Sequence, residues 1–170
     1  MDSKDITLTK YMLKPGFIYV SSRPAVVSTV LGSCVAVCVY DTTRNTGGMN
    51  HFQKPKTTSQ VNSTARYGNV STLALINIML KGGSKPENLE AQIIGGSYNP
   101  FFSDKDIGKK NIKAAKKVLK KKNVKIVSED TGGEKGRKVI FNTLNNELAV
   151  VKVETLRECD WYPYRNARIN

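Results

Sequence analysis

Cys34 and His51 have the residue types and the surroundings that nucleophilic catalysis needs. Cys34 follows Gly32-Ser33, where glycine allows a sharp turn. Backbone amides at such a turn, here those of Ser33 and Cys34, can lower a thiol pKa and bind a developing oxyanion. His51 is the single histidine of the chain, so histidine-dependent catalysis must use it. Together, a thiol and an imidazole supply an activated nucleophile and a proton donor for the leaving group.

The segments around these residues predict how the two side chains could meet. Residues 34–40 are rich in valine and predict a β-strand. The polar segment 41–48 predicts a loop that turns the chain back, which places the extended segment 49–52 beside that strand. In this arrangement the imidazole of His51 comes within reach of the Cys34 thiol.

A catalytic histidine also needs a polar group that orients its ring. Ser28 and Thr29 are the nearby hydroxyl candidates, because both lie in the predicted strand 25–31. Adjacent strand residues point to opposite faces of a sheet, so only one of them can serve. The residues alone leave the choice open.

The other cysteines suggest neither a disulfide nor a metal centre. Cys38 lies about 13 Å from Cys34 along the same strand, which is too far for a disulfide, so it is expected in the core. Cys159 has no assigned role. The three cysteines include no CxxC pair and no apolar leader precedes them, which predicts reduced thiols in the cytoplasm and no metal.

Four pairs of glycines occur, at 47–48, 82–83, 95–96 and 132–133. None of them belongs to a GxxxxGK[ST] phosphate loop or to a GxGxxG motif after a strand. They therefore predict turns, bulges and close backbone contacts rather than a nucleotide site, and no organic cofactor is expected.

The pattern as a whole predicts one mixed α/β domain of the α+β class, with layered β-sheets and flanking helices rather than a doubly wound parallel sheet. The domain is expected to span residues 1–170, with a core at about 15–153 and a tail or covering segment at 155–170. Further strands are expected at 15–20, 89–94, 124–127, 139–142 and 148–153. A helix at 70–80 is expected to share one face among Leu73, Ile76, Asn77 and Leu80, and a helix at 108–122 among Ile112, Ala115, Val118 and Leu119. No segment approaches the roughly 20 apolar residues that membrane insertion needs.

The chain carries 27 Lys and Arg against 14 Asp and Glu, a formal net charge of +13. Much of the excess lies in the predicted helix 108–122, whose lysines are Lys109, Lys110, Lys113, Lys116, Lys117, Lys120, Lys121 and Lys122. A solvated helix face is the simplest interpretation. No aromatic stacking platform accompanies the lysines, so nucleic-acid binding is not supported. Docking to an acidic protein surface, such as receptor helices rich in glutamate, is the more specific hypothesis.

Several motifs resemble those of the CheD family of chemoreceptor glutamine deamidases. Segments 30–41 (VLGSCVAVCVYD) and 47–52 (GGMNHF) resemble the family in order and spacing. The resemblance continues through 66–68, 94–96, 107–111, 129–133 and 136–137, and covers about residues 15–153. The chain departs from the family at Gln53-Lys54, where two apolar residues usually precede the proline.

The resemblance implies an enzyme that hydrolyses glutamine side chains of chemotaxis receptors to glutamate and ammonia. By position, Cys34 matches the nucleophile and His51 the general base and acid. The third member is a threonine: counting back without a gap gives Ser28, whereas the threonine itself is Thr29. The implied fold is similar to that of cysteine deamidases of the bacterial toxin type.

The resemblance also implies partners. These are the cytoplasmic domains of chemotaxis receptors as substrate and a CheC-type phosphatase that the family binds. A mainly regulatory partner of that phosphatase, without a dominant catalytic role, and a basic binding module are the alternative functions. We expect a monomer.

Overall fold

The computed structural model describes residues 8–156 of the chain. In chain order, the elements of this range are β1 (Thr9–Met12), β2 (Phe17–Val20), β3 (Ala25–Leu31), β4 (Val35–Asp41), β5 (Thr46–His51), α1 (Gly68–Lys81), the 3₁₀ turn η1 (Pro86–Asn88), β6 (Leu89–Gly95), α2 (Ile107–Lys121), β7 (Lys125–Thr131), β8 (Gly136–Asn142) and β9 (Leu148–Val153). Neither α-helix in this range has the length and apolar character of a membrane span.

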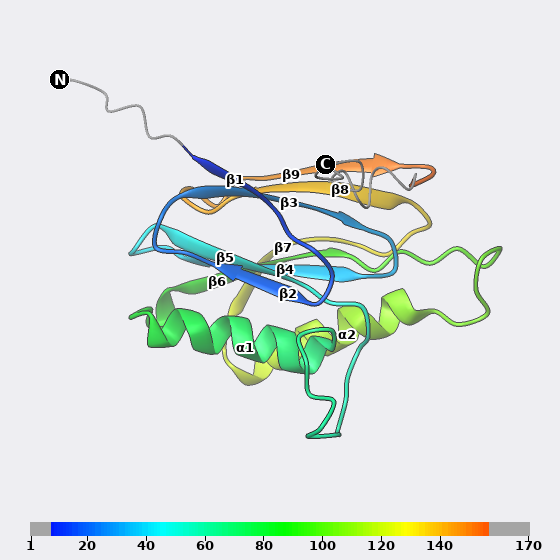
Figure 1. Ribbon diagram of the computed structural model, residues 1–170, viewed down its shortest axis with the longest axis horizontal. Coiled ribbons are helices and arrows are strands. Elements are labelled where there is room, and N and C mark those ends of the chain that lie inside the picture. The colour runs from blue at the N-terminus through cyan, green and yellow to red at the C-terminus, as the bar shows by residue number, and fades with distance from the viewer. Residues whose placement is uncertain (1–7, 157–170) are drawn as a thin grey trace, which may run out of the picture.

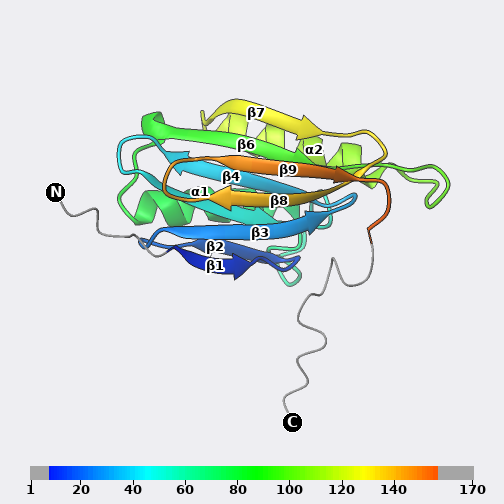
Figure 2. The ribbon, with the colours of Figure 1, turned by 90° about the horizontal axis from the view of Figure 1, so that it is seen from above.

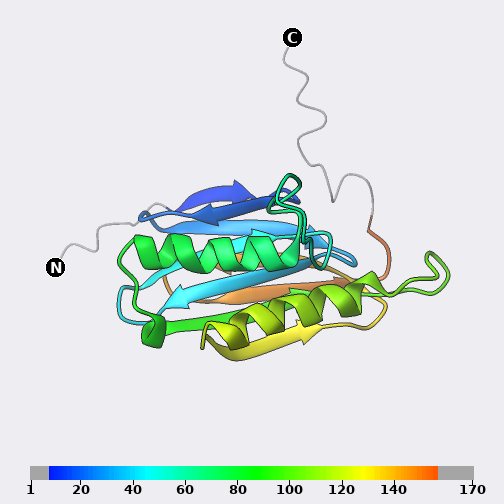
Figure 3. The same ribbon diagram turned by 90° about the horizontal axis from the view of Figure 1, so that it is seen from below.

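The strands form two sheets that lie face to face, and both helices cover the outer face of the five-stranded sheet (Figure 1). The four-stranded sheet has the order β1-β3-β8-β9, and the five-stranded sheet has the order β2-β5-β4-β6-β7. Neighbouring strands are antiparallel except β1–β3 and β6–β7, which are parallel. The two sheets are seen from above in Figure 2, and the helical layer from below in Figure 3. This layered arrangement confirms the predicted α+β class.

Strand β4 is buried on both faces, which explains its near-continuous apolar sequence. Val35 and Val37 belong to the core between the five-stranded sheet and the helices. Ala36 and Cys38 belong to the second core, between the two sheets. Cys38 is fully buried, as predicted. Strand β4, which begins directly after Cys34, is thus held from both sides.

The helix predicted at 70–80 forms as α1, but its predicted apolar face is wrong in part. Leu73 is 37% exposed and Asn77 is half-buried, whereas Leu75 and Met79 are buried. Only Ile76 of the predicted face is fully buried. The other buried positions are small or polar: Gly68, Ser71 and Thr72. Since α1 has apolar residues on all sides, periodicity could not identify the face that the sheet covers.

Helix α2 agrees with the prediction. Ala115 and Leu119 are buried, and Ile112 and Val118 pack beside them against the helix-side core. The helix begins after Asp106, whose carboxylate accepts a hydrogen bond from the Lys109 N–H at 2.8 Å. Its opposite face consists largely of exposed lysines.

Several predicted boundaries are wrong. The loop predicted at 41–48 is a shorter turn, because Asn45 takes a left-handed conformation (φ 50°) and β5 begins at Thr46. Strand β7 continues to Thr131 instead of ending at 127, since parallel pairing with β6 holds the polar residues extended. Similarly, β8 begins at Gly136 rather than 139, and the short, mostly exposed β1 has no counterpart in the prediction. Of the segment 155–170, only residues 155 and 156 are described.

Candidate active site

Cys34 lies in the bend between β3 and β4, at one end of the sandwich. The carbonyl of Gly32 accepts a hydrogen bond from the Ser97 N–H at 3.0 Å. The carbonyl of Cys34 accepts one from the Gly96 N–H at 2.8 Å. The segment that follows β6 therefore fixes the backbone of residues 32–34, which we call the nucleophile loop after its candidate nucleophile Cys34.

This backbone contact requires glycines. Gly95 and Gly96 have positive φ angles of 105° and 69°, a region that side chains disfavour. A Cβ atom at Gly95 would collide with the Cys34 carbonyl oxygen, and one at Gly108 would collide with the backbone of Gly96. Backbone thus packs directly on backbone, with no side chain between, where the end of β6 meets the nucleophile loop and where the first turn of α2 meets Gly96. The prediction that Gly95-Gly96 serves a close backbone contact is confirmed.

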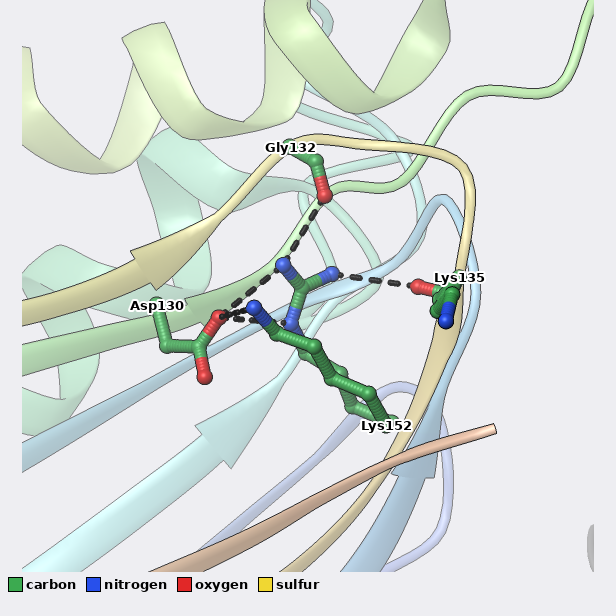
Figure 4. A network of polar contacts seen from close by, with 5 residues as sticks. Asp130, Gly132, Lys135 and Lys152 are labelled. Carbon is green, nitrogen blue, oxygen red and sulfur yellow. Dashed lines mark hydrogen bonds and ion pairs between the residues drawn. The ribbon is translucent and has the colours of Figure 1, made fainter. Parts of the chain in front are cut away.

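The segment 95–98 is supported in turn by the β7–β8 connection, whose own polar contacts are shown in Figure 4. Gly132 N–H donates to the Gly95 carbonyl at 3.0 Å, and Tyr98 N–H donates to the Gly133 carbonyl at 2.8 Å. The buried guanidinium of Arg137 organises this connection, donating at 3.0–3.2 Å to the Asp130 carboxylate and the Lys135 carbonyl and at 2.8 Å to the Gly132 carbonyl. Lys152 from β9 adds an ion pair to Asp130 at 3.4 Å.

The amide groups of the nucleophile loop are available for an oxyanion. Among residues 8–156, no other residue accepts a hydrogen bond from the N–H of Ser33 or Cys34. Their own carbonyls are engaged elsewhere, by Asn111 and Gly96. In a trans peptide the N–H of Cys34 points away from the Ser33 carbonyl, so fixing that carbonyl also fixes the direction of the amide.

His51 is the last residue of β5 and shares a sheet face with Cys34. Val35 lies opposite Phe52 in an antiparallel bridge, and both belong to the helix-side core. The residues that precede them, Cys34 and His51, therefore point to the opposite face, toward the other sheet. In this register they are diagonal neighbours, a relationship in which residues lie about 7–8 Å apart. The predicted approach of segments 49–52 and 34–40 is confirmed.

Of the two hydroxyl candidates, Thr29 is the one that contacts the imidazole. Its Oγ1 lies 2.8 Å from Nδ1 of His51, in a buried contact that crosses from β3 to β5. Ser28 points to the other face of β3, where its hydroxyl contacts the Tyr11 carbonyl at 3.5 Å and the Met12 sulfur at 3.8 Å. The structure thus brings Thr29 into contact with His51, places Cys34 on the same sheet face as His51, and leaves Ser28 on the opposite face of β3.

The hydrogen bonds of Thr29 assign the tautomer of His51. The Thr29 hydroxyl donates to the Leu13 carbonyl at 2.7 Å. Because a hydroxyl has a single proton, its oxygen must accept from His51, so Nδ1 carries the hydrogen. The other ring nitrogen, Nε2, then carries the lone pair, and it is buried without a hydrogen-bond partner among the described residues. The ring is therefore presented as a base through Nε2.

Burial keeps both reactive groups neutral at rest. It lowers the pKa of His51 from 6.5 to about 4, against the opposing effect of the Leu13 carbonyl. It raises the pKa of the Cys34 thiol from 9.0 to about 11, although the Cys34 amide acts in the other direction. The Cys34 amide therefore lowers this thiol pKa as expected, but desolvation has the larger effect and the pKa is raised overall.

Asn111 is a site residue that the sequence-based analysis missed. It lies on α2 and is fully buried, and its Nδ2 donates to the Ser33 carbonyl at 2.9 Å and to the Gln53 carbonyl at 3.0 Å. One amide group thereby joins the residue before Cys34 to the second residue after His51. The available signal was a polar residue on the otherwise apolar face of α2, one turn before Ala115.

A pocket of about 490 Å³ adjoins the nucleophile loop. Gly32 and Ser33 form part of its wall, together with Tyr98 and Phe102 from the connection between β6 and α2. Phe102 is 87% exposed. Cys34 and His51 do not line this pocket, so it lies beside the reactive pair and offers an apolar surface to a bound segment.

The remaining residues that the sequence singled out do not join the site. Gln53 and Lys54, where the chain departs from the family, are fixed by Arg66. The Arg66 carbonyl accepts hydrogen bonds from both of their backbone amides at 2.9 and 3.0 Å, and the Arg66 side chain donates to the Gln53 side chain at 3.0 Å. Cys159 lies outside the described residues. Within residues 8–156, no three His, Cys, Asp or Glu side chains are grouped closely enough to hold a metal ion.

Comparison with known sequences places these residues in a family context. The family model described as CheD chemotactic sensory transduction matches residues 52–152. Proteins named "Probable chemoreceptor glutamine deamidase CheD" are similar to the chain. The relative from Janthinobacterium sp. (strain Marseille) is 37% identical over 84% of this chain and 72% of its own length. Those from Trichlorobacter lovleyi and Methanococcus vannielii are 37% and 36% identical, over 81% and 82% of this chain and 86% and 93% of their own lengths.

Proposed function

The chain belongs to the CheD family, and we propose that it is a protein-glutamine deamidase acting on chemoreceptors. The relatives carry this activity in their names. The observation that most directly supports it here is the Thr29–His51 contact at 2.8 Å, which leaves Nε2 of His51 free as a base on the face it shares with Cys34. The reaction is hydrolysis of a linear amide: side-chain glutamine and water give glutamate and ammonia.

In the proposed first step, the Cys34 sulfur attacks the carbon of the glutamine side-chain amide. Because the thiol and the imidazole are both neutral at rest, Nε2 of His51 takes the thiol proton as the C–S bond forms. The negative charge that develops on the amide oxygen is bound by the backbone N–H groups of Ser33 and Cys34.

In the second step, protonated Nε2 of His51 gives its proton to the amide nitrogen, and the C–N bond breaks. Ammonia leaves and a thioester to Cys34 remains. A water molecule then loses a proton to Nε2 and attacks the thioester, the C–S bond breaks, and glutamate is released with the thiol restored. Throughout, Thr29 accepts from Nδ1–H and holds the ring in one tautomer.

The pocket of about 490 Å³ beside Ser33 is the proposed contact surface for the segment that carries the glutamine. Tyr98 and Phe102 contribute its apolar side. Because Ser33 lines the pocket and Cys34 does not, a glutamine side chain that enters from this surface meets Ser33 before Cys34.

We propose further that the protein acts in the cytoplasm as a monomer, on the cytoplasmic domains of the receptors. A CheC-type phosphatase is a second proposed partner, which the family resemblance supports. Binding of that phosphatase without catalysis remains the alternative function. The likeness of the fold to toxin-type cysteine deamidases stays a prediction.

The decisive experiment is incubation of the protein with a receptor cytoplasmic domain, followed by peptide mass spectrometry. We expect a mass increase of about 1 Da at specific glutamines, since an amide becomes a carboxyl group. Cys34→Ala should abolish the conversion. Cys38→Ala is the matched control, because it removes a buried thiol from β4, the strand that follows Cys34, without touching the site. Full activity of Cys34→Ala would exclude the mechanism. Phosphatase binding without any conversion would favour the regulatory alternative.

A further inference from the structure

A groove runs along the outer surface of α2, on the helical layer seen in Figure 3. It consists of two adjoining hollows of about 540 and about 390 Å³, which share Lys56, Ala114 and Lys117 in their walls. Apolar atoms come from Ala114 and Val118 of α2 and from the exposed Leu73 of α1. This accounts for Leu73, which the fold leaves outside the core.

The rim of the groove is cationic and lacks counter-charges. No Asp or Glu lines either hollow. Lys116 pairs with Glu129 at 2.7 Å, but none of the carboxylates in the described part of the chain pairs with Lys113, Lys117 or Lys120. Like charges one helical turn apart, such as Lys113 and Lys117, destabilise a helix. The rim therefore carries an electrostatic cost that an acidic ligand would offset.

The shape and the chemistry of the groove favour a helix as its occupant. Ala114 and Val118 are spaced by one helical turn, so the floor is a narrow apolar strip between rows of lysines. An amphipathic helix with an apolar stripe and acidic flanks complements such a strip. No aromatic residue lines either hollow, so nucleic-acid bases find no stacking surface. The apolar atoms lie in a concavity, whereas binding to a bilayer surface requires apolar groups that protrude into it.

The groove also leads to the candidate active site. Lys110 lines the first hollow and precedes Asn111, whose amide holds the carbonyls of Ser33 and Gln53. The start of α2 and the bend between β3 and β4 lie at the same end of the molecule (Figure 1). A helix seated in the groove and extended past Lys110 therefore reaches the end of the sandwich where Cys34 lies.

From these observations we propose that the groove docks an acidic amphipathic helix of a chemoreceptor cytoplasmic domain. This proposal rests on the proposed function, because it assigns a docking site to the same substrate. It separates two tasks: α2 holds the receptor by charge and an apolar strip, and the site at Cys34 acts on the glutamine.

Binding can be tested apart from catalysis by using Cys34→Ala protein, which we expect not to turn over its substrate. Calorimetry should measure Kd for a receptor cytoplasmic domain at about 50 and about 300 mM NaCl. We expect affinity to fall at least tenfold with salt. The triple variant Lys113→Glu/Lys117→Glu/Lys120→Glu should bind at least tenfold more weakly and show a smaller salt dependence.

The matched control is Lys10→Glu/Lys81→Glu/Lys85→Glu. It removes the same charge from exposed lysines that line neither hollow, and its Kd should stay within twofold of the parent. Equal weakening in both triple variants would overturn the proposal, because net charge alone would then explain binding. Unchanged affinity of the groove variant would also overturn it.

Two further measurements keep this proposal distinct from the deamidase function. In the active enzyme, the groove variant should raise KM severalfold and leave kcat nearly unchanged. An active enzyme whose groove variant has an unchanged KM refutes the docking site and leaves the deamidase function intact. Displacement of the receptor domain by duplex DNA or by anionic vesicles, with loss of their binding in the groove variant alone, would assign the groove to those ligands and overturn the proposal.

Discussion

The hydroxyl of Thr29 and Nδ1 of His51 meet at 2.8 Å across the interface between the two sheets. Thr29 belongs to the four-stranded sheet and His51 to the five-stranded sheet. The imidazole therefore depends for its orientation on how the two sheets pack. Because Thr29 donates to the Leu13 carbonyl, it can only accept from the ring, and Nε2 is left as the base.

Replacing Thr29 by valine should lower kcat by about 10- to 100-fold, with little change in KM. Valine keeps the shape of threonine but leaves Nδ1–H without an acceptor, so the ring loses its fixed tautomer. Thr29→Ser should recover most of the activity. Ser28→Ala is the control, since its hydroxyl lies on the other face of β3, and it should retain full activity. Steady-state kinetics of deamidation would decide, and equal losses in Thr29→Val and Ser28→Ala would refute the assignment.

The protein should become less stable as the pH falls from 6.5 to about 4, the pKa values of His51 in the unfolded and the folded chain. Burial lowers this pKa from 6.5 to about 4, so between these values the unfolded chain binds a proton that the folded chain does not. The free energy of unfolding therefore falls as the pH is lowered through the window, by about 3 kcal/mol in total. Urea unfolding across it should show this slope in the parent and a reduced slope in His51→Gln. An unchanged slope would contradict the neutral, buried state of the ring.

The Cys34 thiol should react as an ordinary thiol with a high pKa in the absence of substrate. Since burial raises its pKa to about 11, alkylation by iodoacetamide should accelerate steadily with pH up to that value. The measurement is best made in a Cys159→Ser background, with Cys34→Ala/Cys159→Ser reporting any reaction of Cys38. A rate that reaches its plateau below about pH 8 would instead indicate a preformed thiolate.

Asn111→Ala should lower kcat by about tenfold or more and change KM less. The Ser33 carbonyl loses its donor in this variant, so the Cys34 amide loses its fixed direction. Gln92→Ala is a matched control: its buried amide also donates two hydrogen bonds, at 3.0 and 2.9 Å, but to Asn146. Both variants should be compared at equal folded fraction, established by thermal unfolding. A kcat equal to that of the parent in folded Asn111→Ala would exclude a positioning role.

The local sequence pattern was sufficient to predict the strands that carry the site. Strand 25–31 and the turn before Cys34 are determined by residues that are neighbours in the sequence. The choice between Ser28 and Thr29 could not be made in this way. Both faces of β3 carry valines, and which face is covered by the second sheet is a property of the tertiary packing. The same holds for α1, where Leu73 was expected on the buried face and lies at the groove instead.

The pKa values illustrate a second limit. The turn at Gly32-Ser33 suggested a lowered thiol pKa, since backbone amides lie next to Cys34. The opposing effect, desolvation between the packed sheets, arises only when distant segments meet, and it is the larger one. Asn111 was missed for the same reason: its partners, the carbonyls of Ser33 and Gln53, lie far from it in the sequence.

The contacts that β1 makes with β3, and those that Arg137 makes, determine when during folding the enzyme can become active. The β4–β5 hairpin is local and can form early; it contains His51, and Cys34 directly precedes it. The Leu13–Thr29–His51 chain of hydrogen bonds needs both sheets, and the Gly132–Gly95 contact needs the strand that ends at Thr131. Such non-local contacts form late in folding. A chain that is still being synthesised should therefore have no deamidase activity until β8 has joined the sandwich.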